Sequence, residues 1–376
     1  MPIIPNSSSI SPAPGRLTTS SESPSSPGRS PENRVKLEYE VVPLHTKHRF
    51  TIARAGHTER YAVWVRLSEE DGPSGWGEAD PSPYYGETAD TVRAALEGCR
   101  RVLEVARDPF ALQEIEAACL ADLGGAASAR AAIISALYDL MGKRLGAPVH
   151  RLLGLDPSRA PWTSFTIGID ESEVVRQKVR EAVVDEFPIL KVKVGTDLDE
   201  EILSIVREEA PDVRLRVDAN TVWNPKQAVS RIEALESFEL EFVEQPVAAH
   251  DIDGLRFVRE RSPVPIIADE SCVRATDIPR LVGAVDGINI KLAKCGGISE
   301  ALRMIHTARS HSLSVMLGCM VETSLGIAAA AQLAPLVDYA DLDGAALLAD
   351  DPFSGISIAR GRVHLSAEPG LGVFRR

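Results

Sequence analysis

Hydrophobic and polar positions in the first third of the chain repeat with periods that predict secondary structure. Two stretches, 35–42 and 61–67, alternate in strand fashion and are rich in β-branched and aromatic residues. Further along, apolar residues recur every three or four positions, and an Ala- and Leu-rich helix is predicted over 129–145, before a glycine and a proline. Strands followed by helices predict a first α+β domain over 35–155.

Beyond residue 160 the pattern changes to short apolar runs at regular distances. The predicted strands start 22 to 27 residues apart, which is the length that one strand, one crossover helix and two short loops require. They lie at 163–168, 189–194, 213–218, 240–244, 264–269, 286–291, 313–318 and 338–342. Eight such strands in a row predict a closed parallel α/β barrel over 156–349. A doubly wound open sheet is the competing architecture, but no GxGxxG sequence follows the first strand.

The two ends of the chain have their own composition. Residues 1–34 contain ten Ser and seven Pro, so this segment buries little apolar surface and is predicted to be a disordered tail. A transit peptide is the alternative, although the prolines oppose an amphipathic helix. No helix is predicted after the eighth strand, and the Gly- and Pro-punctuated segment 350–376 is expected to pack back on the first domain.

Overall composition narrows the classes of partner. The net charge of −13 argues against nucleic acid or an anionic membrane as the main partner. The five cysteines are scattered and form no CxxC pair, which disfavours a disulfide framework or a zinc cluster and favours a reducing, cytoplasmic location. No apolar run approaches the roughly 20 residues that span a bilayer. A small-molecule partner is therefore expected.

Charged residues gather at the ends of the predicted strands, where barrel enzymes place their active sites. The second strand ends in Lys191-Val192-Lys193, whose lysines point to the same side because successive residues of a strand alternate. The next four strands end in Asp218, Glu244, Asp269 and Lys291. Any one of these residues could be a helix N-cap or a solvated charge, but three consecutive acidic strand ends between basic ones favour a functional site.

This arrangement predicts a metal site with opposed bases. Three converging carboxylates repel one another unless a cation lies between them, and all-oxygen ligation favours Mg²⁺ first and Mn²⁺ second. A metal that binds a substrate carboxylate stabilises the enediolate formed when the α-proton leaves. A lysine beside a metal and a second lysine has a lowered pKa and can act as a base. Lysines on opposite sides of the ring would reach opposite faces of one α-carbon and invert it.

Two more residues near the strand ends have expected supporting roles. Glu270 is expected to support or cap the site rather than to bind metal. Cys319 has no evident His partner, which favours a small buried thiol after the seventh strand over a nucleophile.

These residues and several motifs resemble the enolase superfamily, in its mandelate racemase/muconate lactonizing enzyme-like branch. Within that branch the chain is most similar to dipeptide epimerases of the L-Ala-D/L-Glu type, over residues 37–365. The motifs include Gly75-Trp76-Gly77-Glu78, Pro83-Tyr84-Tyr85-Gly86-Glu87, Lys191-Val192-Lys193, Lys294-Cys295-Gly296-Gly297, Gly318-Cys319-Met320-Val321-Glu322 and Asp341-Leu342-Asp343.

The resemblance implies a (β/α)7β barrel with an N-terminal α+β capping domain. It implies metal-assisted 1,1-proton transfer at the α-carbon of the C-terminal residue of a dipeptide. Lys193 and Lys291 would be the opposing acid/base residues, with Lys191 lowering the pKa of Lys193 and stabilising the enolate. The metal ligands implied for one Mg²⁺ are Asp218, Glu244 and Asp269. Many members of the branch are oligomeric, so a homo-oligomer is also expected.

The resemblance also implies contacts to the dipeptide. Asp341 and Asp343 would meet its α-ammonium group in a charge-assisted pair, and Cys319 is a further expected contact. The segment before residue 61 is predicted to be a loop of the capping domain, and it is basic; its cations are Lys47, His48, Arg49 and Arg54. It would suit an acidic second residue, as in L-Ala-L-Glu, with Arg54 as the substrate contact, although a solvated charge cluster is the alternative.

Two other functions compete with this one. N-succinylamino-acid racemases and o-succinylbenzoate synthases share the frame, but their substrates carry no free α-ammonium group, so Asp341 and Asp343 would have little purpose. A muconate-type cycloisomerase fails for the same reason. A binding protein without catalysis is disfavoured because it has no need for opposed lysines.

Overall fold

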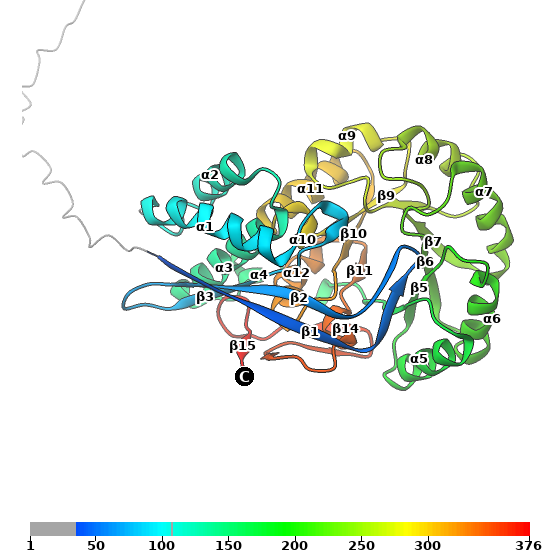
Figure 1. Cartoon of the computed structure of the whole chain (residues 1–376), viewed down its shortest axis with the longest axis horizontal. Coiled ribbons are helices and arrows are strands. Elements are labelled where there is room, and N and C mark those ends of the chain that lie inside the picture. The colour runs from blue at the N-terminus through cyan, green and yellow to red at the C-terminus, as the bar shows by residue number, and fades with distance from the viewer. Residues whose placement is uncertain (1–34, 107) are drawn as a thin grey trace, which may run out of the picture. The chain divides into compact units, whose positions relative to one another are not determined.

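The computed structural model describes residues 35–106 and 108–376, so the predicted disordered tail lies outside the described residues. The chain first forms an antiparallel sheet of β1 (Lys36–Ile52), β2 (Ala55–Ser68) and β3 (Ser74–Ala79). The two predicted strands are confirmed within β1 and β2. The basic segment between them, which we expected to be a loop, is instead the far end of this long hairpin (Figure 1). Backbone pairing rather than burial holds this end, so no alternation of apolar residues reveals it.

Helices cover this sheet and complete the cap. They are α1 (Ala89–Val105), α2 (Leu112–Leu123) and α3 (Ala127–Leu145), the last confirming the predicted helix, followed by the short α4 (Val149–Leu152). Gly75 and Gly77 allow α3 to lie directly on β3, because a Cβ at either position would be 1.9 Å from a backbone oxygen of the helix. Asp139 of α3 fixes the contact by accepting a hydrogen bond of 2.8 Å from the Trp76 amide.

The second part of the fold is a barrel of eight parallel strands in sequential order. These are β4 (Phe165–Ile167), β5 (Ile189–Lys193), β6 (Arg214–Asp218), β7 (Leu240–Glu244), β8 (Ile266–Ala268), β9 (Gly287–Lys291), β10 (Ser314–Gly318) and β11 (Tyr339–Asp341). Each observed strand lies within its predicted range. A bridge between Thr163 and Ala340 joins the first and last strands and closes the ring.

Helices surround the barrel on its outer face (Figure 1). They are α5 (Ser172–Val184), α6 (Asp199–Glu209), α7 (Pro225–Ala234), α8 (Ile252–Arg259), α9 (Ile278–Leu281), α10 (Leu292–Cys295), α11 (Ile298–Ser310) and α12 (Ser324–Ala331). The last strand is followed by a 3₁₀ turn, Gly344–Leu347, rather than by an α-helix, which confirms the (β/α)7β arrangement. No described helix is long and apolar enough to cross a bilayer.

The C-terminal segment lies against the cap. Its short strands are β12 (Phe353–Ser354), β13 (Ser357–Ala359), β14 (Arg362–His364) and β15 (Phe374–Arg375). The fully buried Phe353 ring makes edge contacts with Trp64 and Trp76 at centroid distances of 5.0 and 5.9 Å. The Leu371 amide donates a hydrogen bond of 2.8 Å to Asp139. The end of the chain therefore packs on the same sheet and helix that form the cap.

Candidate active site

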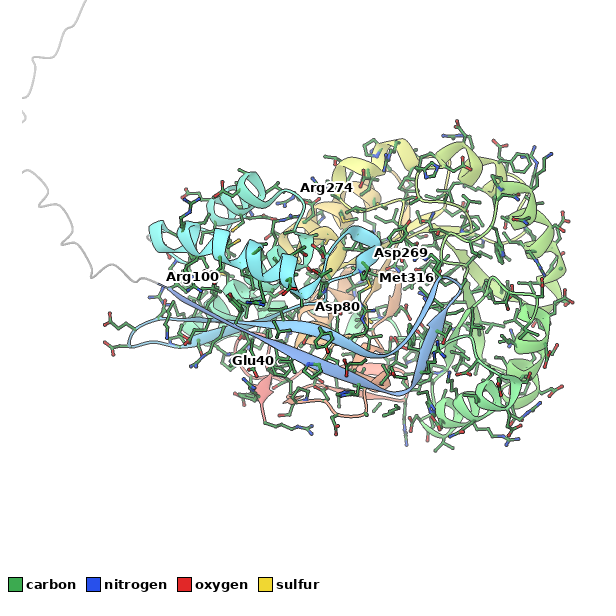
Figure 2. All side chains as sticks on the ribbon, viewed as in Figure 1. Glu40, Asp80, Arg100, Asp269, Arg274 and Met316 are labelled. Atoms are coloured by element: carbon green, nitrogen blue, oxygen red, sulfur yellow. The ribbon has the colours of Figure 1, made fainter. Side chains whose placement is uncertain are left out.

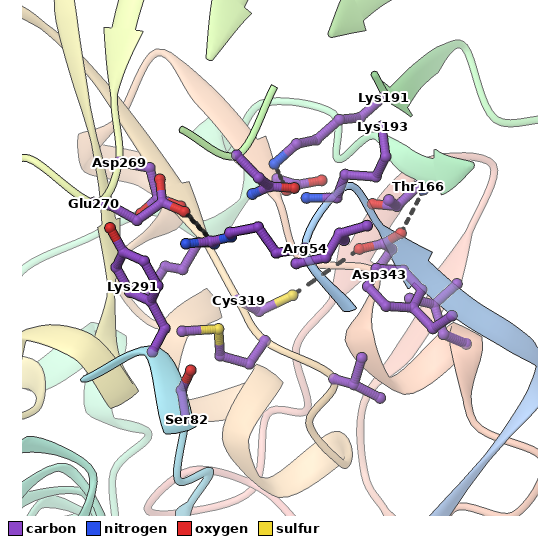
Figure 3. A pocket seen from close by; sticks show the side chains of 18 of the residues that line it. Arg54, Ser82, Thr166, Lys191, Lys193, Asp269, Glu270, Lys291, Cys319 and Asp343 are labelled. Carbon is purple, nitrogen blue, oxygen red and sulfur yellow. Dashed lines mark hydrogen bonds and ion pairs between the residues drawn. The ribbon is translucent and has the colours of Figure 1, made fainter. Parts of the chain in front are cut away.

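A pocket of about 110 Å³ lies at the carboxyl ends of the barrel strands, beneath the cap hairpin (Figure 3). Most of the predicted site residues line it: Arg54, Lys191, Lys193, Asp269, Lys291, Cys319, Asp341 and Asp343. The other two predicted residues, Asp218 and Glu244, are fully buried just behind this surface. The fold therefore gathers all ten at one end of the barrel.

The alternation of strand β5 directs its lysines into the pocket. Val192 and Val194 are fully buried in the hydrophobic core. Lys191 and Lys193 alternate with them along the chain and therefore face the inside of the barrel, where they line the pocket. Lys291 ends strand β9 and reaches the pocket from the opposite side (Figure 3). The predicted opposition of lysines is thus present in the fold.

Ammonium groups neutralise the buried carboxylates of the site. The Lys191 Nζ atom lies 3.1 Å from Asp218 Oδ2, 2.7 Å from Glu244 Oε2 and 2.8 Å from Asp341 Oδ2. The Lys193 Nζ atom lies 2.6 Å from Asp218 Oδ2. Buried charges of this kind persist because each has a partner of opposite sign.

Asp269 is shared between two lysines. Its Oδ2 atom accepts a hydrogen bond of 2.8 Å from Lys291, and its Oδ1 atom accepts one of 2.6 Å from the fully buried Lys294. Lys294 also donates to the Asp269 carbonyl oxygen at 2.7 Å. The sequence motif contained Lys294, but we had assigned it no role. It lies three residues after Lys291, which is the spacing that returns a side chain to the same side of the short helix α10.

The pKa values of Lys191 and Lys291 are raised rather than lowered. Burial lowers the pKa of Lys191, but the attraction of three surrounding carboxylates outweighs burial and holds this pKa well above its ordinary value. Burial also lowers the pKa of Lys291, but the surrounding carboxylates, Asp269 above all, outweigh burial, so this pKa is raised. The ammonium groups are the counter-charges of the acidic strand ends, which is the physical reason for the difference.

The acidic strand ends fit a hard divalent cation by their chemistry. Asp218, Glu244 and Asp269 come from the adjacent strands β6 and β7 and the residue after β8, and they offer oxygen atoms alone. Across residues 35–106 and 108–376, no group of three or more His, Cys, Asp or Glu side chains lies close enough together to hold a metal ion. In the site, lysine ammonium groups lie between the carboxylates. The buried Asn220 Oδ1 atom nevertheless has no hydrogen-bond partner. Asn289 donates a hydrogen bond of 2.8 Å to Glu244 Oε1, so that Oε2 faces the Lys191 ammonium group.

A second acidic pair lies at the end of the barrel sheet. Asp341 Oδ1 accepts a hydrogen bond of 2.6 Å from Ser164, and Asp343 Oδ2 accepts one of 2.6 Å from the Thr166 amide. Burial and the neighbouring Asp341 raise the pKa of Asp343 to about 7. Asp343 is thus a buried acceptor whose charge is unfavourable until a cation approaches. The partly buried Cys319 lies 4.0 Å from it.

The four basic side chains of the hairpin lie in two different cavities. Arg54, at the turn of the hairpin, pairs with Glu270 at 2.7 Å and lies 4.0 Å above the Tyr84 ring. Glu270, which also lines the pocket, therefore holds Arg54 in this position. Lys47, His48 and Arg49 line a separate recess. Arg54 alone of the four basic residues lines the catalytic pocket.

The sequence matches family models over both parts of the fold. Residues 36–154 match the mandelate racemase/muconate lactonizing enzyme N-terminal domain, and residues 174–374 match the enolase C-terminal domain-like family. The chain belongs to the mandelate racemase/muconate lactonizing enzyme family of the enolase superfamily. This membership accounts for the order of cap and barrel along the chain.

Several similar proteins are named as dipeptide epimerases. The chain is 40% identical to an L-Ala-D/L-Glu epimerase from Bacteroides thetaiotaomicron over 343 residues, which are 91% of this chain and 88% of that protein. It is 38% identical to a hydrophobic dipeptide epimerase from Enterococcus faecalis, over 88% of this chain and 96% of that protein. A crystal structure of a dipeptide epimerase from Enterococcus faecalis, complexed with Mg and L-Leu-L-Tyr, matches 90% of this chain and 99% of its own with a TM-score of 0.84 at 37% identity.

Proposed function

We propose that the protein is a dipeptide epimerase that inverts the α-carbon of the C-terminal residue of its substrate. The observation that carries this proposal is the placement of Lys193 and Lys291 on opposite sides of one pocket that ends in the Asp341 and Asp343 carboxylates. Opposed lysines suit inversion, and the terminal acidic pair suits a free α-ammonium group.

The chemical steps are proton transfers by the two lysines. The α-carbon lies between Lys193 and Lys291, and the lysine in its neutral form removes the α-proton from one face. The opposite lysine, as an ammonium, returns a proton to the other face. Lys191 lies behind Lys193 and places a positive charge near the negative charge that develops in the enolate.

A divalent cation would complete the carboxylate end of the site. Asp218, Glu244 and Asp269 would hold Mg²⁺, with Mn²⁺ as the second choice by the same oxygen chemistry. The ion would supply positive charge that stabilises an enediolate. The three carboxylates would then be shared between the ion and the lysine ammonium groups that they contact in the structure.

The remaining contacts select the dipeptide. Asp341 and Asp343 bind the α-ammonium group, and Cys319 lies beside this position. Arg54 gives one guanidinium nitrogen to Glu270, which leaves further N–H donors for the side chain of the second residue. An acidic side chain, as in L-Ala-L-Glu, fits these donors. An N-succinylamino acid offers no ammonium group to Asp341 and Asp343, which disfavours the racemase and synthase alternatives.

The test is a substrate comparison in the presence of Mg²⁺. We expect L-Ala-L-Glu to be epimerised at its C-terminal residue, and we expect N-acetyl-L-Ala-L-Glu, which lacks the ammonium charge, to lose roughly 10- to 100-fold in kcat/KM. N-succinylamino acids serve as the competing substrates. Faster racemisation of an N-succinylamino acid than of any free dipeptide would overturn the proposal.

A further inference from the structure

Two of the five cysteines lie against each other in the cap. Cys99 belongs to helix α1 and Cys119 to helix α2, and both side chains are fully buried. The Cys99 thiol donates a hydrogen bond to the Cys119 sulfur, with 3.4 Å between the two Sγ atoms. The cysteines are 20 residues apart in the chain, so the fold brings together a thiol pair that sequence spacing does not reveal.

Helical spacing explains why the two thiols meet. On α1, Cys99 lies three residues after Leu96 and four before Leu103. On α2, Cys119 lies four residues after Ile115. These intervals place each thiol on one side of its helix with other core residues. Because α1 and α2 pack against each other, the two apolar sides bring both sulfur atoms into the interface.

The two helices are anchored to different parts of the molecule. Arg100 of α1, labelled in Figure 2, donates a hydrogen bond of 2.8 Å to the Leu37 carbonyl oxygen of strand β1. Glu116 of α2 accepts hydrogen bonds of 2.5 and 3.1 Å from Arg303 of the barrel helix α11. A covalent bond between the two thiols would therefore connect the cap sheet to the barrel through α1 and α2.

The surroundings of the pair favour reaction at Cys119. The hydrogen bond from Cys99, together with the positive charge of Arg130, outweighs burial and lowers the pKa of the Cys119 thiol. By contrast, burial raises the pKa of Cys272 and of Cys295 to about 12. Because the thiolate is the attacking form in disulfide exchange, Cys119 is the thiol that reacts first.

We infer that Cys99 and Cys119 are an oxidation site, at which an intramolecular disulfide forms and joins α1 to α2. A disulfide holds its sulfur atoms about 2 Å apart, so each sulfur would move by about 0.7 Å. The inference concerns the cap and is independent of the proposed epimerase function.

The oxidant in this reaction is a small-molecule disulfide such as glutathione disulfide. The Cys119 thiolate attacks one of its sulfur atoms, and the first glutathione leaves as a thiolate. The Cys99 thiol then loses its proton and attacks the Cys119 sulfur of the mixed disulfide, which releases the second glutathione. The two cysteine protons end on the two glutathione thiols, so one disulfide is reduced as the new one forms.

Access of the oxidant requires a local opening, because both thiols are buried. The outer side of α2 is exposed at positions 113, 114, 117 and 120, so the pair lies beneath a single helix at the surface. Opening of this helix alone exposes Cys119, and such local openings need less free energy than global unfolding.

The experiment oxidises the full-length protein with glutathione disulfide and measures both linkage and stability. We expect peptide mapping to find Cys99 and Cys119 in one linked pair, two hydrogens lighter than the separate peptides. The disulfide closes a loop of 20 residues, which should raise the thermal midpoint by roughly 2–5 °C. A reductant should reverse the rise.

The controls are variants of single cysteines. Cys119→Ala should abolish the linked pair and the rise in the midpoint, and Cys99→Ala serves if that variant does not fold. Cys272→Ala, which removes a buried thiol outside the pair, should keep both. The inference is wrong if the two thiols stay free after oxidation, if the linked pair forms without a rise, or if oxidation raises the midpoint of Cys119→Ala as much as that of the wild type.

Discussion

The buried Lys294 side chain fixes the orientation of Asp269, one of the three proposed metal ligands. It takes the Oδ1 atom and the carbonyl oxygen of Asp269, which leaves Oδ2 to face the pocket. Outer partners of this kind fix the orientation of metal ligands, and their loss weakens binding about 10- to 100-fold. We therefore expect Lys294→Met to weaken Mn²⁺ binding by this factor in calorimetric or EPR titration.

The matched control is another buried lysine of the barrel. Lys178 pairs with Asp170 at 2.9 Å, outside the catalytic pocket. Lys178→Met should leave the Mn²⁺ affinity within about twofold of the wild-type value, since Lys178 contacts none of the proposed metal ligands. Equal Mn²⁺ affinity in Lys294→Met and the wild type would contradict the assigned role.

Individual site residues were predictable to different degrees. Lys191, Lys193 and the acidic strand ends followed from position alone, because alternation and the barrel rule fix where strand ends point. The pairing of Arg54 with Glu270 was not predictable, since it joins a hairpin turn to a barrel loop 216 residues away. The raised pKa values of Lys191 and Lys291 depend on which carboxylates surround each ammonium group, and only the folded structure shows this arrangement.

Strand β3 and helix α12 are joined by a buried carboxylate. Glu78 accepts hydrogen bonds from the Trp64 indole at 3.1 Å and from the Thr323 amide at 2.9 Å, as well as from the Thr323 hydroxyl. Burial, followed by the nearby Glu322, raises the pKa of Glu78 to about 8. The folded protein therefore holds a proton that the unfolded chain releases at lower pH.

This proton makes stability depend on pH with a definite sign. The contribution of Glu78 is fully present below its ordinary pKa of 4.5 and is lost as pH rises through about 8. The slope is up to about 1.4 kcal/mol per pH unit. We expect Glu78→Gln to flatten the fall in unfolding free energy between pH 5 and pH 8, measured by urea denaturation. Identical slopes for variant and wild type would rule out Glu78 as the titrating group.

Secondary-structure elements were predicted best where burial imposes a period. All eight barrel strands lie within their predicted ranges because each is buried on both faces. The outer part of the β1–β2 hairpin was missed, since its side chains in β1 are exposed or only partly buried and its hydrogen-bonded ladder imposes no hydrophobic period. Arg54 lies at the turn of that hairpin, so the missed element is the one that carries the proposed specificity contact.

At the scale of the whole molecule, the C-terminal segment packs on the cap and is expected to stabilise it. The fully buried Phe353 contacts Trp64 and Trp76, whereas Phe374 of the same segment is 50% exposed. We expect Phe353→Ala to lower the free energy of unfolding by about 3–5 kcal/mol. Phe374→Ala should change it by less than about 1 kcal/mol. Equal effects of the two variants in urea denaturation would show that the segment does not stabilise the cap.

The domain boundaries predicted at residues 155/156 and 349/350 stay predictions. The family models end and begin at 154 and 174, and the C-terminal segment contacts the cap directly. Such contacts between distant parts of the chain leave no periodic signal in the sequence. The sequence therefore predicted that the segment packs on the first domain, but not which residues it contacts.

The two-base mechanism is tested most directly by α-proton exchange in D₂O with single lysine variants. Lys193→Ala and Lys291→Ala should each lose epimerisation of L-Ala-L-Glu by about 10²- to 10⁴-fold, the range for a general acid or base. Each variant should still exchange the α-proton of one epimer of the C-terminal residue, and the two variants should exchange opposite epimers. Full epimerisation by either variant, or exchange of the same epimer by both, would contradict the account.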